Sequence, residues 1–460
     1  MSKERYFLGV DLGTSYFKAG LFDGKGNLAG MGRQPVKKTT EGGICELPVP
    51  VFWSALRECV GEAVKNAGIS PGKIEALSYS SQANSFILLD QNDEPLTSLI
   101  LWPDNRAEST YKPSGITEHV DFRVHTGLGI VPGHQFCVAK INWFQRLHPS
   151  VWEQVRRIMS VADYLVFSLT GQALSDYSTA SLTGLLSVAE LRWWDDMLNE
   201  TKIRSEYMSL PVRMGTRVGK LTVPGAHQIG LDTRTLFFMG GLDHHLAGVG
   251  AGLLSRNRIS ESTGTVLACV AYKKNDAPVP GTCTAPGLDQ DHFFQMSFDD
   301  NGASSLEWYQ KKYAPALTIP ELIRMAAGVK AGCRNLIALP SAERYEDLTG
   351  FRNREAYHRH GHFVRAILES TARSLAGIST VIKGDAQPEG IVGTGGGAKS
   401  RIWGQIKADL TGMNFLIPEC TESACLGAAM LAAIGVREYD DLKGITGDWV
   451  KTAVCLMPNR

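Results

Sequence analysis

YFLGVDLGTSYFKAGLFDGKGNLAG (residues 6–30) is an apolar, β-rich stretch that two turns interrupt. Residues 6–11 predict a strand, residues 13–15 a tight turn, and residues 16–22 a second strand. The segment DGKGN (residues 23–27) then turns toward a third strand. The glycines are therefore spaced for a β-hairpin, and not for the strand–glycine–helix unit of a dinucleotide-binding fold.

A second hairpin of the same kind is predicted in the other half of the chain. RISESTGTVLACVAY (residues 258–272) again runs strand, turn, strand, with Gly264-Thr265 at the turn. The two Gly-Thr turns each open about half of the chain, which indicates two halves built on related plans. We therefore expect one domain over residues 1–240 and another over residues 241–460. Because Gly-Thr is a common pair, coincidence stays open as an alternative for this feature alone.

Helical and strand patterns alternate elsewhere, which predicts an α/β fold. Residues 51–68 and 362–378 each predict an amphipathic helix, the first ending at Gly68. LTSLILWPDNRAEST (residues 96–110) predicts a strand that runs into a helix. GIVGTGGGAKSRIWGQIKADLTG (residues 390–412) predicts a strand, a glycine loop and a helix.

Composition excludes several classes of function. The 460 residues are 43% hydrophobic and 20% charged, and 47 basic residues balance 47 acidic ones. A single core rarely exceeds about 250–300 residues, so two domains are expected. The neutral balance gives no reason to expect nucleic acid or a membrane surface as partner. With no apolar leader and nine scattered cysteines, we expect a reduced, cytoplasmic protein.

The Gly-Thr turns have the chemistry of phosphate-binding loops. A turn without bulky side chains lets backbone N–H groups approach phosphate oxygens, and the threonine hydroxyl adds a donor. Asp11 ends the first strand two residues before Gly13, so its carboxylate can serve Mg²⁺ directly or through water. A surface hairpin with a local aspartate turn is the alternative for either hairpin alone.

VGTGGGAKS (residues 392–400) is a third glycine loop, framed by an apolar strand and a helix that starts near Ser400. Loops of this kind suit the close approach of a flat nucleoside. We interpret Gly395-Gly396-Gly397 as that loop, with a flexible turn as the alternative.

GGLDHHLAG (residues 240–248) places an aspartate before two histidines. Adjacent residues diverge by about 100° on a helix and point to opposite faces of a strand, so the three side chains do not converge on one metal ion. We expect a helix to start here, with Asp243 near its positive end. A second histidine group, at positions 358, 360 and 362, is expected to be structural.

Six blocks occur in an order that resembles one protein family. They are GVDLGTSYFKAGLFD (9–23), SQANSFILLD with LILWPDNRA (81–107), LTGQALSDYSTASLTGLL (169–186), GGLDHHLAGVGAG (240–252), STGT (262–265), and GTGGGAKSRIWGQIKADLTG with ESACLGAAMLAAIG (393–435). Together they are similar to the FGGY family of carbohydrate kinases over nearly the whole chain. That resemblance implies two actin-like, ribonuclease-H-like domains with a cleft between them. It also implies ATP- and Mg²⁺-dependent phosphorylation of a sugar hydroxyl.

The resemblance also assigns roles to individual residues. Asp243 resembles the catalytic base and Asp11 the Mg²⁺ aspartate. The residues expected near the ATP phosphates are Gly13, Thr14, Ser15, Lys18, Gly264, Thr265 and Gly302. The residues expected near adenosine are Gly395, Gly396, Gly397 and Ser400. The residues expected near the sugar are Gln82, Asn84, Trp102, Asp104, Arg106, Asp243 and His244.

The substrate-side residues depart from the family in part. SSQANSF (residues 80–86) keeps Gln82 but lacks the Met-His of xylulokinase-like members and the Arg-Glu of glycerol kinases. Asp104 favours the ketose-using branches, so we expect a pentulose or hexulose such as xylulose. A polyol, deoxy sugar or sugar acid remains an alternative, as does a non-catalytic, nucleotide-binding actin-like protein. The sequence leaves a homodimer open.

Overall fold

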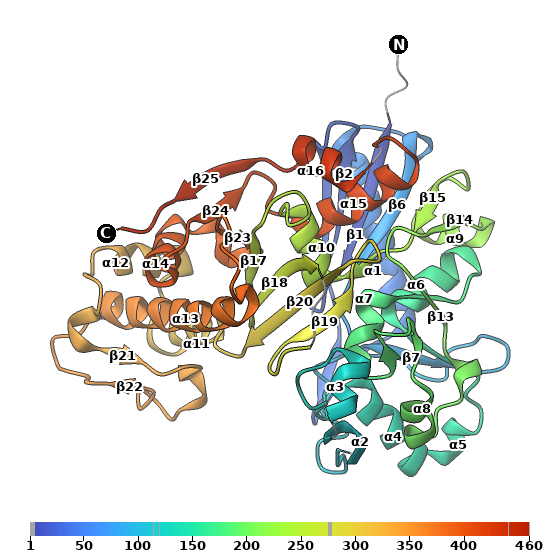
Figure 1. Cartoon of the computed structure of the whole chain (residues 1–460), viewed down its shortest axis with the longest axis horizontal. Coiled ribbons are helices and arrows are strands. Elements are labelled where there is room, and N and C mark those ends of the chain that lie inside the picture. The colour runs from blue at the N-terminus through green and yellow to red at the C-terminus, as the bar shows by residue number, and fades with distance from the viewer. Residues whose placement is uncertain (1–4, 114, 119, 275–277, 440, 460) are drawn as a thin grey trace. The chain divides into compact units, whose positions relative to one another are not determined.

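The computed structural model describes residues 5–113, 115–118, 120–274, 278–439 and 441–459, and the chain divides into two compact units. Unit 1 consists of Met1–Gly250, Tyr272–Gln295 and Ala424–Trp449, and unit 2 of Ala251–Ala271, Met296–Ser423 and Val450–Arg460. Each unit combines strands with flanking helices (Figure 1). Two segments from the C-terminal half of the sequence therefore complete unit 1.

The large sheet of unit 1 has the strand order β14-β15-β6-β1-β2-β3, with β16 also paired to β6. Its strands are β1 (Tyr6–Leu12), β2 (Tyr16–Asp23), β3 (Leu28–Pro35), β6 (Ile74–Ser81), β14 (Arg217–Lys220), β15 (Leu236–Phe238) and β16 (Gly241–Leu242). β1, β2 and β3 pair antiparallel in succession, which confirms the hairpins predicted in residues 6–30. β1, β15 and β16 each run parallel to β6. β1 is buried along nearly its whole length, which explains its continuous apolar sequence.

A smaller sheet of unit 1 has the order β4-β5-β8-β7-β9. Its strands are β4 (Thr39–Glu41), β5 (Ile44–Leu47), β7 (Phe86–Leu89), β8 (Leu99–Ile100) and β9 (Arg157–Ser160). Two short pairs join β10 (Leu174–Asp176) to β13 (Leu210–Val212) and β11 (Leu186–Ser187) to β12 (Arg192–Trp193). The α-helices are α1 (Val49–Ala67), α2 (Gly115–Glu118), α3 (Val120–Thr126), α4 (Cys137–Leu147), α5 (Pro149–Trp152), α6 (Val161–Thr170), α7 (Tyr177–Ala180), α8 (Asp195–Thr201), α9 (Val223–Ile229), α10 (Asp243–Gly250), α15 (Ser423–Gly435) and α16 (Leu442–Trp449).

Glycines in the strands let helices lie directly against the large sheet of unit 1. A Cβ on Gly32 in β3 would lie 1.9 Å from the carbonyl oxygen of Cys59 in α1. A Cβ on Gly9 in β1 would lie 1.8 Å from the carbonyl oxygen of Cys425 in α15. The red helix α15 and the blue strand β1, from opposite ends of the sequence, therefore pack together (Figure 1). α1 ends as predicted, with Gly68 at its C-cap at a φ of 65°.

Unit 2 contains strands in the order β18-β17-β23-β24-β25. They are β17 (Ile259–Thr263), β18 (Leu267–Lys274), β23 (Ile391–Thr394), β24 (Phe415–Pro418) and β25 (Thr452–Leu456). Along the chain β18 is followed by β19 (Cys283–Pro286), which belongs to unit 1, and by β20 (His292–Asp299), which begins in unit 1. The helices are α11 (Ser304–Tyr313), α12 (Ile319–Ala327), α13 (His360–Lys383) and α14 (Arg401–Thr411), and the short strands β21 (Ile337–Ala338) and β22 (Phe351–Arg352) pair. β17 pairs antiparallel to β18 and parallel to β23, which repeats the pairing of β1 with β2 and β6.

The helix predicted directly after the strand at residues 99–100 is wrong. Residues 102–103 and 106–110 form turns instead. The carboxylate of Asp104 accepts hydrogen bonds from the backbone N–H of Arg106 (3.1 Å) and of Cys45 (2.6 Å). Such bonds from an aspartate to the backbone compete with helix formation. Pro103 further disfavours a helical conformation in the residue before it.

Candidate active site

Three parallel strands of unit 1 end at one edge of its large sheet. In the register with β6, Asp11 of β1 and Gly241 of β16 both lie opposite Ser80. Gln82 follows the last residue of β6, and Asp243 follows the last residue of β16. Neighbouring strands are about 4.8 Å apart. The register therefore brings together Asp11, Gln82 and Asp243, which are far apart in the sequence.

The turn between β1 and β2 holds the predicted phosphate-side residues of unit 1. Asp11 is 7% exposed, and its Oδ2 lies 3.7 Å from Nζ of Lys18. Its Oδ1 accepts a hydrogen bond of 2.9 Å from the serine hydroxyl opposite it on β6. A Cβ on Gly13 would lie 2.8 Å from the carbonyl oxygen of Tyr16, so this tight turn favours glycine. Ser15 is exposed at the turn.

Thr14 joins this turn to the predicted sugar-side residues. Its hydroxyl accepts a hydrogen bond from Nε1 of Trp102 (2.8 Å) and donates one to Oε1 of Gln82 (3.1 Å). Ser85 donates to the same Oε1 (2.9 Å) and accepts from the backbone N–H of Trp102 (2.8 Å). Gln82 is 4% exposed, and its amide nitrogen donates to the carbonyl of Leu12. The structure thus brings together three predicted residues, Thr14, Gln82 and Trp102.

Asn84 lies beside this network with its side chain bonded to the chain itself. Its Oδ1 accepts a hydrogen bond from the backbone N–H of Cys137 (3.0 Å), and its Nδ2 donates to the carbonyl of Leu182 (3.1 Å). Cys137 is the first residue of α4, so Asn84 fixes the start of that helix. Its φ of 58° lies in the left-handed region, which asparagine tolerates better than most residues.

Asp104 and Arg106 form a buried ion pair. Nε of Arg106 lies 2.8 Å from Oδ1 of Asp104, and Nη2 lies 2.9 Å from Oδ2. Nη2 of Arg106 also bonds to Glu46 at 2.5 Å. Burial raises the pKa of Asp104, but hydrogen bonds from Arg106 and from the backbone N–H of Cys45 outweigh it and hold the pKa below its ordinary value. Both carboxylate oxygens of Asp104 accept hydrogen bonds from other groups of the chain, so this side chain stabilises the loop that contains it.

Asp243 begins α10, as predicted, and is partly exposed. Its Oδ1 accepts a hydrogen bond of 2.7 Å from the backbone N–H of His244. His245 is 1% exposed, and its Nδ1 lies 2.7 Å from the hydroxyl of Ser178. The same hydroxyl accepts from the backbone N–H of Leu242 (2.9 Å), which fixes the residue before Asp243. His245 is therefore buried and held within the chain, next to the residues that precede Asp243.

Neither histidine group forms a metal centre in the described part of the chain, where no cluster of three metal-ligating side chains occurs. His358 accepts a hydrogen bond from the backbone N–H of Glu355, and His362 accepts one from Arg359. His360 pairs with the hydroxyl of Tyr309 at 3.0 Å. The three imidazoles therefore serve separate local contacts at the start of α13.

The second Gly-Thr turn, Gly264-Thr265, lies in unit 2 and is in contact with Gly302, which is also predicted to lie near the phosphates. A Cβ on Gly302 would lie 2.3 Å from the carbonyl oxygen of Thr265 and 2.5 Å from that of Gly264. The backbone N–H of Ala303 donates to the carbonyl of Gly264 (2.7 Å), and the hydroxyl of Ser304 donates to the carbonyl of Thr265 (3.0 Å). Gly264 and Thr265 are themselves exposed. The predicted phosphate-side residues of unit 2 therefore lie in contact, with Gly302 buried beneath the exposed turn.

The glycine loop after β23 lies next to this turn because β23 pairs parallel to β17. A Cβ on Gly397 would lie 2.8 Å from Cβ of Thr263, the last residue of β17. A Cβ on Gly396 would meet no atom of the described residues within 4 Å, and Gly395 has a φ of 70°. Ser400 caps α14, because its hydroxyl accepts the backbone N–H of the third helical residue.

A buried ion pair beneath these loops was not predicted from the sequence. Lys407 of α14 and Glu261 of β17 have side chains that are 0% exposed, and Nζ lies 2.6 Å from Oε1. Nζ also donates to the hydroxyl of Thr263 (2.8 Å), which donates in turn to Oε2 of Glu261 (2.7 Å). The helical pattern of residues 401–411 contained the signal, since it places Lys407 among apolar positions. This group anchors the residue that precedes the Gly-Thr turn.

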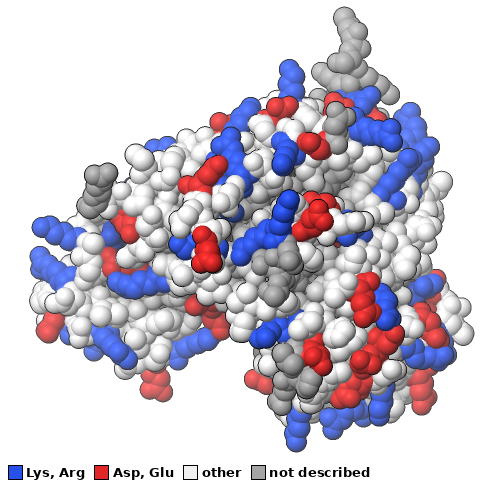
Figure 2. Space-filling view, viewed as in Figure 1, with Lys and Arg blue, Asp and Glu red and all other residues white. Residues whose placement is uncertain are grey.

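Basic and acidic side chains are interspersed on the molecular face drawn in Figure 2. That distribution agrees with the balance of 47 basic and 47 acidic residues. Among the described residues, no helix has both the length and the apolar character needed to cross a bilayer.

The hairpin with a parallel strand at its side occurs in each unit, with glycine turns at the carboxyl ends of the strands. This arrangement is that of an actin-like, ribonuclease-H-like α/β fold, a class that includes nucleotide-dependent phosphotransferases. The N-terminal domain model of the FGGY family of carbohydrate kinases matches residues 6–250, and the C-terminal domain model matches residues 302–436. The chain belongs to this family and is an ATP-dependent carbohydrate kinase, an activity in which Mg²⁺ accompanies the nucleotide.

Individual relatives differ in the substrate that their names give. A xylulose kinase of Lactococcus lactis is 28% identical over 97% of this chain and 91% of its own length. A gluconokinase of Bacillus licheniformis is 27% identical over 95% of this chain and 88% of its own length. The solved structure of a ligand-bound xylulose kinase from Lactobacillus acidophilus matches with a TM-score of 0.88 at 24% identity, covering 99% of this chain and 94% of that one.

Proposed function

We propose that this kinase phosphorylates a neutral ketose, with D-xylulose as the first candidate. The observation that carries the proposal is that the basic side chains at the sugar-side loops, residues 82–85 and 101–106, are already bonded to other groups of the chain. Among the described residues there, Arg106 bonds to Asp104 and Glu46, and Lys140 bonds to backbone carbonyls. Cations held in this way leave little to bind the carboxylate of a sugar acid. The similarity to xylulose kinases supports the same choice.

The residues present fit a Mg²⁺–ATP complex. Asp11 supplies a carboxylate of the kind that Mg²⁺ prefers, and Lys18 faces it. Gly264 and Thr265 offer an exposed turn, and a Cβ on Gly264 would meet no atom closer than 4.0 Å. The open space at Gly396 suits a flat adenine ring. When bound, the nucleotide supplies the phosphoryl group and the cation neutralises charge on it.

Asp243 is proposed as the base that orients the sugar hydroxyl. It lies in the first turn of α10, where the partial positive charge of the helix N-terminus faces its side chain. A carboxylate is too weak a base to ionise an alcohol beforehand, so Asp243 accepts the proton late, as the bond to phosphorus forms. Trp102 and Gln82 then position the sugar, since their own hydrogen bonds hold them in place.

Release of ADP with a panel of acceptors tests the substrate. The panel contains D-xylulose, L-xylulose, D-ribulose, D-fructose, glycerol and gluconate, each with MgATP. We expect the highest kcat/KM with one of the ketoses. A higher kcat/KM with gluconate would refute the neutral-ketose assignment, and no stimulation by any acceptor would refute the proposal as a whole.

The substitution Asp243→Asn tests the base. It keeps the shape of the side chain and removes the proton acceptor, so we expect kcat to fall by about 10²–10⁴-fold. Binding of MgATP, measured by calorimetry, should stay within about two-fold of the unmodified enzyme, since the nucleotide-side loops are unchanged. The variant Asp196→Asn, which changes an exposed aspartate in the first turn of α8, is the matched control for this substitution at a helix start. A kcat of Asp243→Asn close to that of the control would contradict the assignment.

A further inference from the structure

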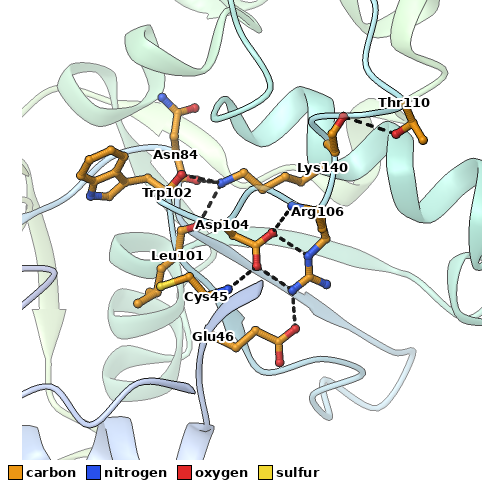
Figure 3. A network of polar contacts seen from close by, with 10 residues as sticks. Cys45, Glu46, Asn84, Leu101, Trp102, Asp104, Arg106, Thr110 and Lys140 are labelled. Carbon is orange, nitrogen blue, oxygen red and sulfur yellow. Dashed lines mark hydrogen bonds and ion pairs between the residues drawn. The ribbon is translucent and has the colours of Figure 1, made fainter. Parts of the chain in front are cut away.

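Lys140 is a buried ammonium that lies beneath the sugar-side loops (Figure 3). Its side chain comes from α4 and is 0% exposed. Nζ donates hydrogen bonds to the carbonyls of Leu101 (2.9 Å), Trp102 (3.1 Å) and Asn84 (3.5 Å). The three N–H groups of an ammonium thus meet three backbone carbonyls, two from residues 101–102 and one from residue 84.

In the part of the chain that the structure describes, no acidic side chain forms an ion pair with Lys140. Asp104 is the acidic residue whose charge acts most on the pKa of Lys140, but its carboxylate oxygens are bonded to Arg106. Two thiols, Cys137 on the same helix and Cys45 on β5, also face this region. Burial raises the pKa of Cys137 to about 12, and it raises that of Cys45, so both thiols are neutral near pH 7. The backbone carbonyls are therefore the groups that hold the buried ammonium.

These carbonyls belong to the residues that present the sugar-side network. The backbone of Trp102 sits between Lys140, which binds its carbonyl, and Ser85, which binds its N–H. Its indole reaches the hydroxyl of Thr14, which in turn bonds to Gln82. A shift of the Trp102 backbone would therefore move the indole and loosen the link to Gln82.

We propose that Lys140 is a positioning residue for sugar binding, because its ammonium locks the loops at residues 82–85 and 101–104 together. A neutral amine has only two N–H groups and adds a lone pair that faces a carbonyl oxygen. A methionine of similar length has no donor at all. Either change leaves buried carbonyls without a partner, and the loops then relax away from the geometry that binds sugar. The inference rests on the proposed function, since it takes these loops as the sugar-binding side.

The geometry predicts a pH dependence that is specific to the sugar. Burial, the largest influence, lowers the pKa of Lys140 to about 8, while the negative charge of Asp104 opposes the shift. The ammonium is therefore complete at pH 7 and is lost as pH rises above about 8. We expect the KM for sugar to rise over pH 7.5–9.5 while the KM for MgATP stays constant. The two other buried side chains with shifted pKa values in residues 82–106 keep their charge between pH 7.5 and 9.5. Asp104 stays ionised, and Arg106 stays protonated.

The test compares Lys140→Met and Lys140→Arg with Lys65→Met, a substitution of an exposed lysine in α1. Each is assayed with whichever sugar the unmodified enzyme phosphorylates best, so a different substrate assignment leaves the test intact. For Lys140→Met we expect the KM for sugar to rise by about 10–100-fold and the KM for MgATP to stay within about two-fold. Lys140→Arg should keep the low KM above pH 8, since its charge persists.

A merely structural role predicts another result. It would lower the unfolding temperature and the active fraction of Lys140→Met, with both KM values unchanged in the folded enzyme. That outcome would overturn the proposal, as would a KM for sugar that rises equally in Lys65→Met. If the Lys140 variants fail to fold, the pH profile of the unmodified enzyme decides. A KM for sugar that is constant from pH 7.5 to 9.5 would then refute the role of the ammonium.

Discussion

Acidification should destabilise unit 1 through one buried imidazole, that of His245. The ring is stacked on Phe294 with centroids 4.5 Å apart, and Nδ1 bonds to the hydroxyl of Ser178. Its Nε2 is buried and has no hydrogen-bond partner among the described residues. Desolvation by burial, with a smaller contribution from the charge of His244, lowers the pKa of His245 from 6.5 to about 3. The folded chain therefore holds this histidine neutral.

The sign and size of the effect follow from proton linkage. Below pH 6.5 the unfolded chain binds a proton at this position and the folded chain does not, so stability falls as pH falls. The contribution of His245 is fully present above its unfolded pKa of about 6.5 and is lost progressively toward the folded value near 3. At pH 5 the difference amounts to about 2 kcal/mol, from roughly 1.4 kcal/mol per pH unit.

The assay compares the unmodified chain with His245→Phe, which keeps an aromatic ring against Phe294. Thermal unfolding of both is measured from pH 7.5 to pH 5 by calorimetry. The other titrating groups of unit 1 contribute equally to both proteins, so their difference isolates His245. We expect the unmodified chain to lose about 2 kcal/mol more than the variant, or about 4 °C for a unit of this size. Parallel pH profiles would refute the account of a buried neutral ring.

Two further predictions concern unit 2. Gly302→Ala places a Cβ 2.3 Å from the carbonyl oxygen of Thr265, so the turn must shift, and we expect the KM for MgATP to rise by at least about ten-fold. Gly377→Ala, whose Cβ would meet nothing within 4 Å, is the control, and equal KM values in the two variants would contradict the steric reasoning. Lys407→Met leaves the buried carboxylate of Glu261 unpaired and should cost about 3–5 kcal/mol of stability. Calorimetry would show the loss, and the double variant with Glu261→Gln should recover part of it; no loss in the single variant would show that the pair adds nothing.

The strands and turns could be predicted because their signals are local. Residues 6–30 contain alternating apolar runs and glycine turns, and the hairpin forms where the pattern placed it. The strand–loop–helix pattern of residues 390–412 and the amphipathic pattern of residues 362–378 likewise match the helices and strand observed. The helix predicted after residues 99–100 is wrong in part for local reasons, Pro103 and the bond from the N–H of Arg106 to Asp104, and in part because the N–H of Cys45, far away in the sequence, also bonds to Asp104. Propensity within one window has no access to such a contact.

Site residues divide in the same way. The position of Asp243 at a helix start could be predicted from its neighbours, because small residues and a polar start mark the boundary. The hydrogen bonds that Asn84 and Asp104 accept within the chain could not be predicted, because the donors are the backbone N–H groups of Cys137 and Cys45, which lie on other elements. These two side chains carry the polar chemistry expected of sugar ligands, yet they use it to hold the loops. Residue type therefore groups side chains that the fold brings close together, but it does not show whether a side chain faces outward.

The two buried lysines hold loops of different kinds. In unit 2, Lys407, paired with Glu261, anchors the residue before the Gly-Thr turn. Glycine has the greatest conformational freedom to lose, so such a turn requires an anchor outside itself. In unit 1, Lys140 is held by the carbonyls of residues 84, 101 and 102, which lie in loops without glycine. Each lysine comes from a helix outside the loop that it holds. Their separation has a kinetic consequence: loss of Lys140 should raise the KM for sugar alone, and loss of Lys407 the KM for MgATP alone.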